Sequence, residues 1–214
     1  MPRRTDFRTW DDYFIQGTTV LRNLFTSPTK PYGETDPSKL RRLEELLTRD
    51  RIAELRAEPI AGEFGYDHMK AIHRHVFQDV YEWAGEERTA PAGHFMTKNG
   101  HSYYPAGASL TAAAEAEYEK LARANLLRGL EQDQFTNALA ESWGEINVVH
   151  SFREGNTRTQ FVLFERLCAQ AGYMLDIERF AKDRDFRDRF VAARFHSQDT
   201  GRNDQLAEVL GEVV

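Results

Sequence analysis

The sequence predicts a mainly α-helical protein with one short β-hairpin. Apolar residues recur at helical spacing over most of the chain, and Asp, Pro and Gly stand where such helices would begin and end. The pair Asn99-Gly100 lies between two short runs of strand-forming residues, as in a tight two-residue hairpin. No repeat, low-complexity tract or Ser/Gly linker divides the 214 residues, so we expect a single domain over 1–214.

Each helix is predicted from an apolar stripe together with a capping residue at one end. In chain order, the expected helices are one opened by Asp36 and Pro37, one over Met69–Trp83 closed by Gly85, one over Ser109–Leu126, one capped by Asp133, one over Thr157–Ala171 closed by Gly172, one capped by Asp176, and one over Asp204–Val213.

Composition argues against several classes of function. The 34 acidic residues outnumber the 28 basic ones, and no stretch concentrates Lys and Arg, so we expect no nucleic-acid partner. Residues 1–10 are charged and no later run is apolar over the thickness of a bilayer, which predicts no membrane association and a cytoplasmic location. Cys168 is the only cysteine and is expected to pack in the core.

The segment before the fifth predicted helix has the features of an anion site. Gly155 and Asn156 tolerate unusual backbone angles and would turn the chain just before a helix whose first N–H groups point outward. Such a turn is a natural phosphate cradle. Arg158, in the first turn of that helix, is disfavoured by the helix dipole, a conflict that a bound phosphate would resolve.

Two more residues complete a set that can carry chemistry. Glu154 is a carboxylate beside this cradle, where polyphosphate would be repelled unless a divalent cation such as Mg²⁺ bridged them. His150 can accept a proton near neutral pH. Each residue alone is more typical of a buried histidine or a capped turn. A base, a metal ligand, a cradle and a cationic clamp together are the parts that phosphoryl-type transfer requires.

The same segment resembles the signature of the Fic family, His-x-Phe-x-(Asp/Glu)-Gly-Asn-(Gly/Lys)-Arg-x-x-Arg. The defining positions that match are His150, Phe152, Glu154, Gly155, Asn156 and Arg158. Residues 76–88 also resemble the family's helix leading into an active-site flap, and the hairpin lies where that flap belongs. With a weaker match at 13–17 and 21–23, the resemblance spans 13–173 and leaves 174–214 as C-terminal helices. It implies a Fic-type helical bundle with a hairpin flap over the active site.

The resemblance implies a protein adenylyltransferase, which moves AMP from ATP to a Tyr, Thr or Ser hydroxyl of a target protein. His150 would be the general base, Glu154 would hold Mg²⁺ on the phosphates, and Phe152 would anchor the loop in the core. The residues expected to bind the nucleotide phosphates are Gly155, Asn156, Thr157 and Arg158.

By the same resemblance, the hairpin would dock the target by pairing a strand edge with an extended segment of it. The flap residues would be Phe95, Met96, Thr97, Lys98, Asn99, Gly100 and His101. The alternative is a hairpin that only packs on its own domain.

Two departures from the family pattern leave other activities open: Thr157 stands where Gly or Lys is usual, and Phe161 replaces the second Arg. Ser151, in place of the usual Pro, changes the stiffness of the loop more than its chemistry. Loss of the second Arg removes a charged contact to the outer phosphates. The alternatives are weak ATP binding, another nucleotide, a partner that completes the site, a Doc-type transfer of the γ-phosphate, or a degenerate, non-catalytic binding module.

Two further expectations concern regulation and metals. The inhibitory motif Ser/Thr-x-x-x-Glu-(Gly/Asn) of many Fic proteins is absent, because Glu154 is the only Glu followed by Gly or Asn and follows a histidine by four positions. A small antitoxin acting in trans is therefore the expected partner besides the target. A zinc site made by His150 and Glu154 alone would lack ligands, and His73 and His75 are predicted to be surface or packing residues.

Overall fold

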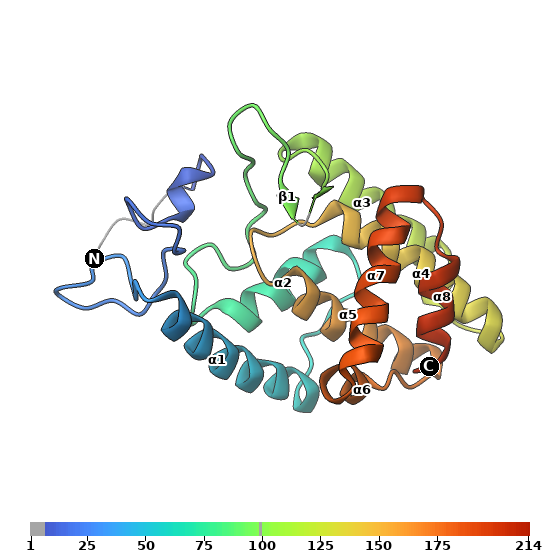
Figure 1. The fold of residues 1–214 in the computed structure, drawn as a ribbon. Coiled ribbons are helices and arrows are strands. Elements are labelled where there is room, and N and C mark those ends of the chain that lie inside the picture. The colour runs from blue at the N-terminus through green and yellow to red at the C-terminus, as the bar shows by residue number, and fades with distance from the viewer. Residues whose placement is uncertain (1–6, 99) are drawn as a thin grey trace.

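The computed structural model describes residues 7–98 and 100–214 and confirms a mainly helical architecture (Figure 1). In the described residues, the elements are the 3₁₀ turns η1 (Asp11–Tyr13) and η2 (Asn125–Leu127), the strands β1 (Thr97–Lys98) and β2 (His101–Ser102), and the helices α1 (Pro37–Ala57), α2 (Tyr66–Phe77), α3 (Ala108–Arg123), α4 (Gln132–Val149), α5 (Asn156–Ala171), α6 (Ile177–Lys182), α7 (Arg184–Thr200) and α8 (Asp204–Gly211).

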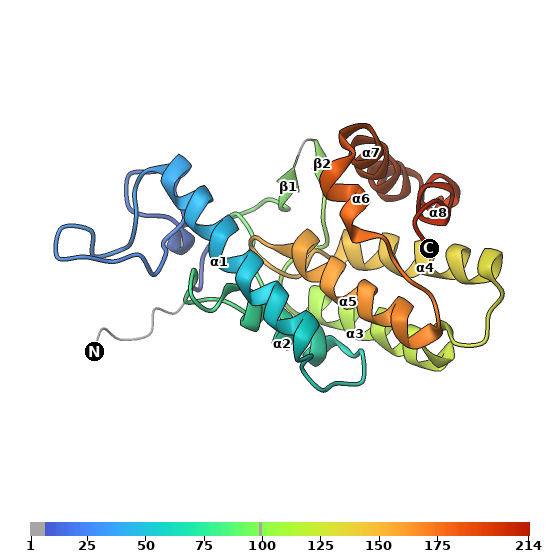
Figure 2. The ribbon, with the colours of Figure 1, turned by 90° about the horizontal axis from the view of Figure 1, so that it is seen from below.

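Helices α2 and α5 pack together in the middle of the molecule. Helix α1 lies along α2 on one side, while α4 contacts α5 and carries α7 and α8 on the other (Figures 1 and 2). Aromatic rings fill this second interface, where Trp143 stacks on Phe164 at 4.4 Å between ring centres and meets the edge of Phe190 at 5.4 Å. The lone cysteine, Cys168, is fully buried among these helices.

The predicted ends of two helices are confirmed. The Asp36 carboxylate accepts hydrogen bonds from the backbone N–H groups of Ser38 (2.8 Å) and Lys39 (3.1 Å), with Pro37 as the first residue of α1. Gly172 closes α5 in the left-handed conformation, with φ of +93°. These caps use local hydrogen bonds, so the sequence specifies them directly.

The helix predicted over 69–83 was too long. Helix α2 ends at Phe77, and irregular turns follow in which Val80, Tyr81, Trp83 and Ala84 are all buried. One face of a helix cannot bury adjacent positions in this way. The chain therefore leaves the helical conformation, which places the rings of both Tyr81 and Trp83 in the core. Gly85 has a positive φ of +82° but caps no helix.

Three other boundaries also differ. Asp133 lies in the first turn of α4 and does not cap it, since Glu131 is the residue that precedes the helix. The helix expected after Asp176 is divided into α6 and α7, because the Asp183 carboxylate accepts the Phe186 N–H at 3.0 Å and starts a new helix. Helix α3 ends at Arg123, and Leu126 has a left-handed φ of +54°.

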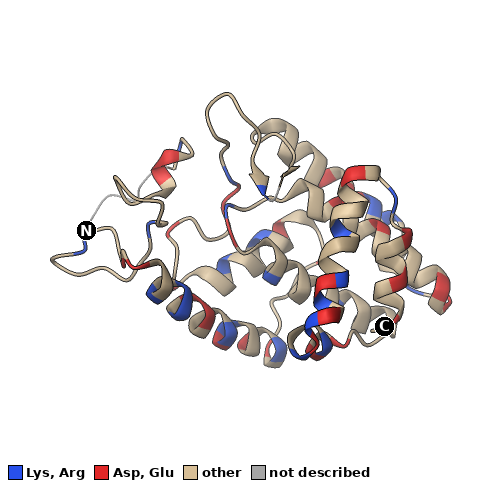
Figure 3. Cartoon of the chain, viewed as in Figure 1, with Lys and Arg blue, Asp and Glu red and all other residues tan. Residues whose placement is uncertain are grey.

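Acidic and basic side chains are mixed over the surface. Figure 3 shows both signs along α1 and on the C-terminal helices, without a continuous basic face of the kind that follows a nucleic-acid backbone. In the part of the chain that the structure describes, no helix combines the length and the apolar character needed to cross a bilayer.

Candidate active site

The motif loop joins two central helices, and its first residue ends the first of them. His150 follows α4 in the left-handed conformation, with φ of +50° and ψ of +59°, and its N–H donates to the Ile146 carbonyl at 3.3 Å. These angles are uncommon for a non-glycine residue, although histidine is among the residues that adopt them more often. His150 is buried at the start of the loop, 6% exposed.

Gly155 turns the loop into α5 at a point where no side chain fits. Its φ is +80°, and a Cβ atom added here would lie 2.2 Å from the Phe77 ring. The predicted anchor, Phe152, is fully buried and stacks on the His73 ring at 3.8 Å. The loop is thus packed tightly against α2 on its inner side.

Asn156 ties the loop to itself. Its side-chain oxygen accepts the Phe152 N–H at 2.9 Å, and its amide nitrogen donates to the Phe152 carbonyl at 2.7 Å. The side chain is 3% exposed. The amide group predicted to bind phosphate is therefore committed to the loop, and the outward-pointing groups here are the backbone N–H groups of the first turn of α5.

His150 lies in a positively charged environment. Burial, then Arg88, Arg194 and Lys98, lower the pKa of His150 well below its usual value. The Tyr103 ring stacks on the imidazole at 3.9 Å between ring centres. The imidazole is therefore neutral at physiological pH, which is the form that can accept a proton.

Arg88 holds His150 in position, a role that the sequence analysis did not assign. The guanidinium group donates from Nε to the His150 carbonyl at 2.6 Å and from one terminal nitrogen to the carbonyls of Tyr104 (2.6 Å) and Val149 (3.3 Å). Burial lowers the pKa of Arg88 to about 10, so the group is still charged at neutral pH. It joins the end of α4 to the segment that follows the flap.

Arg158 is paired within the protein. Its guanidinium donates to the Glu44 carboxylate and to the Thr48 hydroxyl (3.0 Å), both on α1. The second Glu44 oxygen accepts the Tyr81 hydroxyl, and burial followed by the Glu44 charge raises the pKa of Tyr81. Glu44, which no local signal in the sequence indicated, thus offsets the unfavourable position of a cation at the start of α5.

Glu154 borders a cavity of about 650 Å³ between α1, the N-terminal segment and the flap. Glu44, Lys98 and Arg158 line the same cavity. The Glu154 carboxylate accepts the Gly155 N–H at 3.1 Å through one oxygen, and among the described residues no donor is bonded to the other. One protein carboxylate plus substrate phosphates is a common way of holding Mg²⁺, so this donor set fits that ion.

His73 fixes the backbone at Glu154 and was predicted only to pack or lie at the surface. It is fully buried, accepts the Gly85 N–H at Nδ1 (2.8 Å), and so donates from Nε2 to the Glu154 carbonyl (3.0 Å). These two bonds require the neutral ring. Burial lowers the pKa of His73 to about 3. His75 is partly exposed and bonds Glu54 at 3.1 Å.

The predicted flap is a hairpin attached to α7 by one of its two strands. Thr97 pairs with Ser102 and Lys98 with His101; Asn99 lies outside the described residues. On the β2 side, His101 stacks on Phe195 at 3.8 Å and bonds Asp199 at 2.7 Å, and the Ser102 carbonyl accepts a hydrogen bond from Gln198. The other strand follows Phe95, which is 57% exposed, and the buried Met96.

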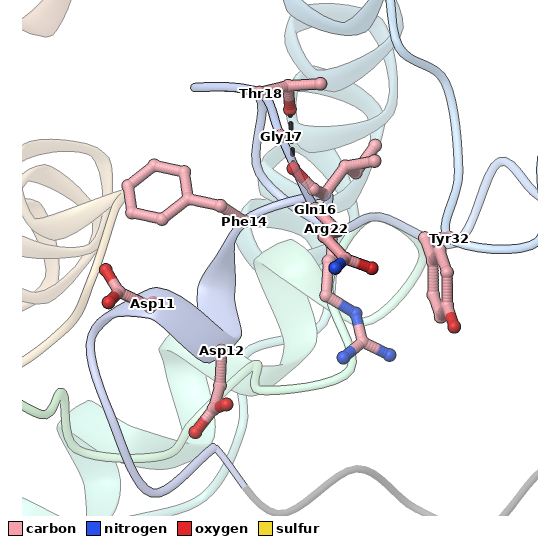
Figure 4. A pocket seen from close by; sticks show the side chains of 9 residues that line it. Asp11, Asp12, Phe14, Gln16, Gly17, Thr18, Arg22 and Tyr32 are labelled. Atoms are coloured by element: carbon pink, nitrogen blue, oxygen red, sulfur yellow. Dashed lines mark hydrogen bonds between the residues drawn. The ribbon is translucent and has the colours of Figure 1, made fainter.

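A second hollow lies in the N-terminal segment and contains none of the motif residues. Asp12, Arg22 and Tyr32 are among the residues that line it, and the Arg22 guanidinium lies 4.8 Å from the centre of the Tyr32 ring (Figure 4). Its volume is about 440 Å³. In the described residues, no group of three His, Cys, Asp or Glu side chains is placed to hold a metal ion by itself, here or at the motif.

Comparison with known proteins identifies the family of this site. The model of the Fic/DOC family matches residues 63–168, which include the flap and the whole motif loop. The probable protein adenylyltransferase y4lH of Sinorhizobium fredii is 35% identical over 167 residues, which are 78% of this chain and 79% of that protein. The chain belongs to the Fic/DOC family.

Other Fic relatives include longer proteins. The probable protein adenylyltransferase Fic of Escherichia coli is 30% identical over 176 residues, 81% of this chain and 80% of that protein. Protein adenylyltransferase VbhT of Bartonella schoenbuchensis is 36% identical over 169 residues, 79% of this chain but 33% of VbhT. The chain therefore matches about a third of the length of VbhT.

Solved Fic structures share the fold, as predicted. The BepC protein of Bartonella tribocorum, crystallised with bound AMPPNP, superposes with a TM-score of 0.80 at 24% identity over 95% of this chain and 96% of that one. The N-terminal Fic domain of a putative cell filamentation protein of Bartonella quintana, with bound ADP, gives a TM-score of 0.80 at 24% identity over 94% of each chain.

The Fic motif departs from its pattern at Phe161, and the structure shows where that ring lies. The ring is partly buried between helices. Its centre lies 4.8 Å from the ring centre of Phe180, 5.4 Å from that of Trp143 and 5.7 Å from that of Phe190. The position thus contributes to the apolar packing of α5 against α6 and α7. Four residues from other elements contact or act on the motif loop: Glu44, His73, Arg88 and Arg194. They are too distant in the sequence for residue spacing to have associated them with the motif.

Proposed function

We propose that this chain transfers AMP from ATP to a hydroxyl side chain of a target protein. The observation that carries the proposal is a buried, neutral His150 at the start of a loop that ends in a helix N-terminus and borders a cavity of nucleotide size. The curated relatives at 30–36% identity are named protein adenylyltransferases, and two of the solved fold neighbours hold AMPPNP or ADP.

His150 acts as the general base in the proposed reaction. It takes the proton from the target hydroxyl, whose oxygen attacks the α-phosphorus of ATP, and the bond to the β-phosphate breaks to release pyrophosphate. Arg88 keeps the imidazole at the end of α4 through the His150 carbonyl. The positive surroundings that lower the pKa of His150 also favour a polyphosphate beside it.

The phosphates lie over the first turn of α5 in this proposal. The N–H groups of Asn156, Thr157 and Arg158 have no acceptor within the helix and are available to phosphate oxygens, and Gly155 allows the close approach. Glu154 would hold Mg²⁺, which neutralises phosphate charge when bound. Arg158 offers its charge from the cavity side, in competition with its bond to Glu44.

The target docks along the free edge of β1. Because β2 is attached to α7, the edge open to a further strand belongs to Thr97 and Lys98, next to the exposed Phe95. A segment paired there presents its hydroxyl by backbone hydrogen bonds, which require little of its sequence.

A small antitoxin in trans and a cytoplasmic location remain our predictions from the sequence. A pull-down that recovers no small partner would contradict the prediction of an antitoxin.

The test is incubation of the purified protein with Mg²⁺, a lysate and ATP labelled at the α- or the γ-phosphate. We expect protein label from the α-phosphate alone, and its loss in His150→Ala, while His75→Ala, a partly exposed histidine of α2, keeps it. Label from the γ-phosphate alone would replace AMP transfer by phosphotransfer. Labelling that survives His150→Ala would remove this histidine from the mechanism.

A further inference from the structure

Arg194 of α7 reaches the motif loop from outside the segment that matches the family model. One terminal nitrogen of its guanidinium donates to the hydroxyl of Thr157, in the first turn of α5, at 3.4 Å, and the other donates to the Asn147 side chain on α4. Its charge also acts on His150. The guanidinium is therefore placed where the loop, α4 and α7 meet.

This cation has no acidic partner. Among the described residues no carboxylate forms an ion pair with Arg194, and its Nε is buried without a hydrogen bond. Burial lowers the pKa of Arg194 to about 10, with only the Tyr103 hydroxyl opposing it. A charge held in this way is costly to a folded protein unless a ligand makes use of it.

The neighbours of Arg194 relate it to the departure in the motif. Its guanidinium carbon lies 5.4 Å from the centre of the Phe190 ring, and the same ring is 5.7 Å from Phe161. Phe161 occupies the motif position that the Fic pattern gives to a second arginine. Arg194 on α7 and Phe161 on α5 thus share one neighbour, the ring of Phe190.

We infer that Arg194 is a phosphate-binding residue of the nucleotide site, and that it supplies from α7 the cationic contact that Phe161 does not. The inference rests on the proposed function. It makes the C-terminal helices part of the substrate site. On binding, the phosphate oxygens accept the Nε–H and a terminal N–H of Arg194 in place of its weak bond to Thr157.

The test is calorimetric titration of AMPPNP and of adenosine, each with Mg²⁺, into the full chain and three variants. Arg194→Met removes the charge, Arg194→Gln keeps a donor for Asn147 but not the charge, and Arg187→Met is the control on the exposed side of α7. We expect both Arg194 variants to bind AMPPNP on the order of 10- to 100-fold more weakly, with adenosine affinity within about twofold and Arg187→Met unchanged.

Other outcomes overturn the inference. Unchanged AMPPNP affinity in Arg194→Gln would make the residue structural, and so would an equal loss for adenosine and AMPPNP together with a lowered melting temperature. If Arg194→Met does not fold, Arg194→Gln alone decides. A wild-type chain that binds neither ligand would refute the proposed function as well, whereas a loss of the Arg194 effect alone leaves that function standing.

Discussion

The two sides of the motif loop treat positive charge differently. On the α1 side, Arg158 is neutralised by Glu44 and bonded to Thr48. On the α7 side, Arg194 has no acid beside it among the described residues, and Arg88 is bonded only to carbonyl groups. One side is balanced before a ligand arrives, while the other keeps surplus positive charge next to the base. Under the proposed function, this contrast predicts that the stronger attraction for phosphate comes from the α7 side.

Removing Arg88 is expected to have the largest effect. Arg88→Met leaves the buried carbonyls of Val149 and His150 without their donor and should lower the free energy of unfolding by about 3 kcal/mol or more. Urea denaturation measures the loss, with Arg74→Met, a surface arginine that bonds Glu86, as the control. A stability change equal to that of the control would mean that Arg88 does not hold the end of α4.

Removing the acid on the α1 side should abolish the contrast between the two sides. Glu44→Gln ends the neutralisation of Arg158 and should lower the free energy of unfolding by about 1–2 kcal/mol, a small value because Arg158 is 30% exposed. AMPPNP affinity should rise, since the released cation faces the cavity. Titration of this variant beside Asp50→Asn, on the exposed side of α1, checks both effects; unchanged affinity would show that Arg158 does not meet the phosphates.

Acid should weaken the fold on the inner side of the loop through His73. Its pKa is about 3 when folded, against about 6.5 when unfolded, so protonation favours the unfolded chain and stability is lost as the pH falls from about 6.5 toward 3. Between pH 7.5 and 5.5 protonation of this one group should lower the free energy of unfolding by about 1.4 kcal/mol. His73→Gln should remove that part of the dependence in urea titrations at the two pH values, whereas an unchanged dependence would contradict a buried, neutral His73.

The smallest effect concerns the base on the α7 side. Because the pKa of His150 is lowered, the acid limb of kcat/KM should fall below pH 6.5. Lys98→Gln removes the weakest of the three cations that act on this histidine, so the limb should move slightly toward higher pH. The pH profile of AMP transfer measures both. A limb at or above pH 6.5 in the wild type would mean that the positive surroundings do not keep His150 neutral.

Local sequence signals predicted what is locally determined. Asp36, Pro37 and Gly172 specify helix ends through bonds to their own neighbours, and the motif loop was found because its residues lie within nine positions. The family and its fold were predicted from that loop. The length of α2 was wrong, because tertiary packing of Tyr81 and Trp83 prevailed over helical spacing.

The rest of the site could not be predicted, because it depends on contacts between distant segments. Glu44 lies 114 residues before Arg158, which it binds, and Arg194 lies 37 residues after Thr157, to which it donates. His73 bonds the carbonyl of Glu154 across 81 residues. Spacing along the chain carries no record of such pairs, and each of these side chains read alone is typical of a surface charge or a packed ring.

Helix α7 has a consequence for how the two substrates would be brought together. It carries Arg194 beside the loop and Gln198 beside β2, four residues apart, which is about 6 Å along a helix axis. One rigid turn of α7 thus separates the proposed phosphate contact from strand β2, whose partner β1 carries the proposed docking edge. A shift of α7 would therefore move Arg194 and the flap together, so the proposed sites for the nucleotide and the target would keep their relative position.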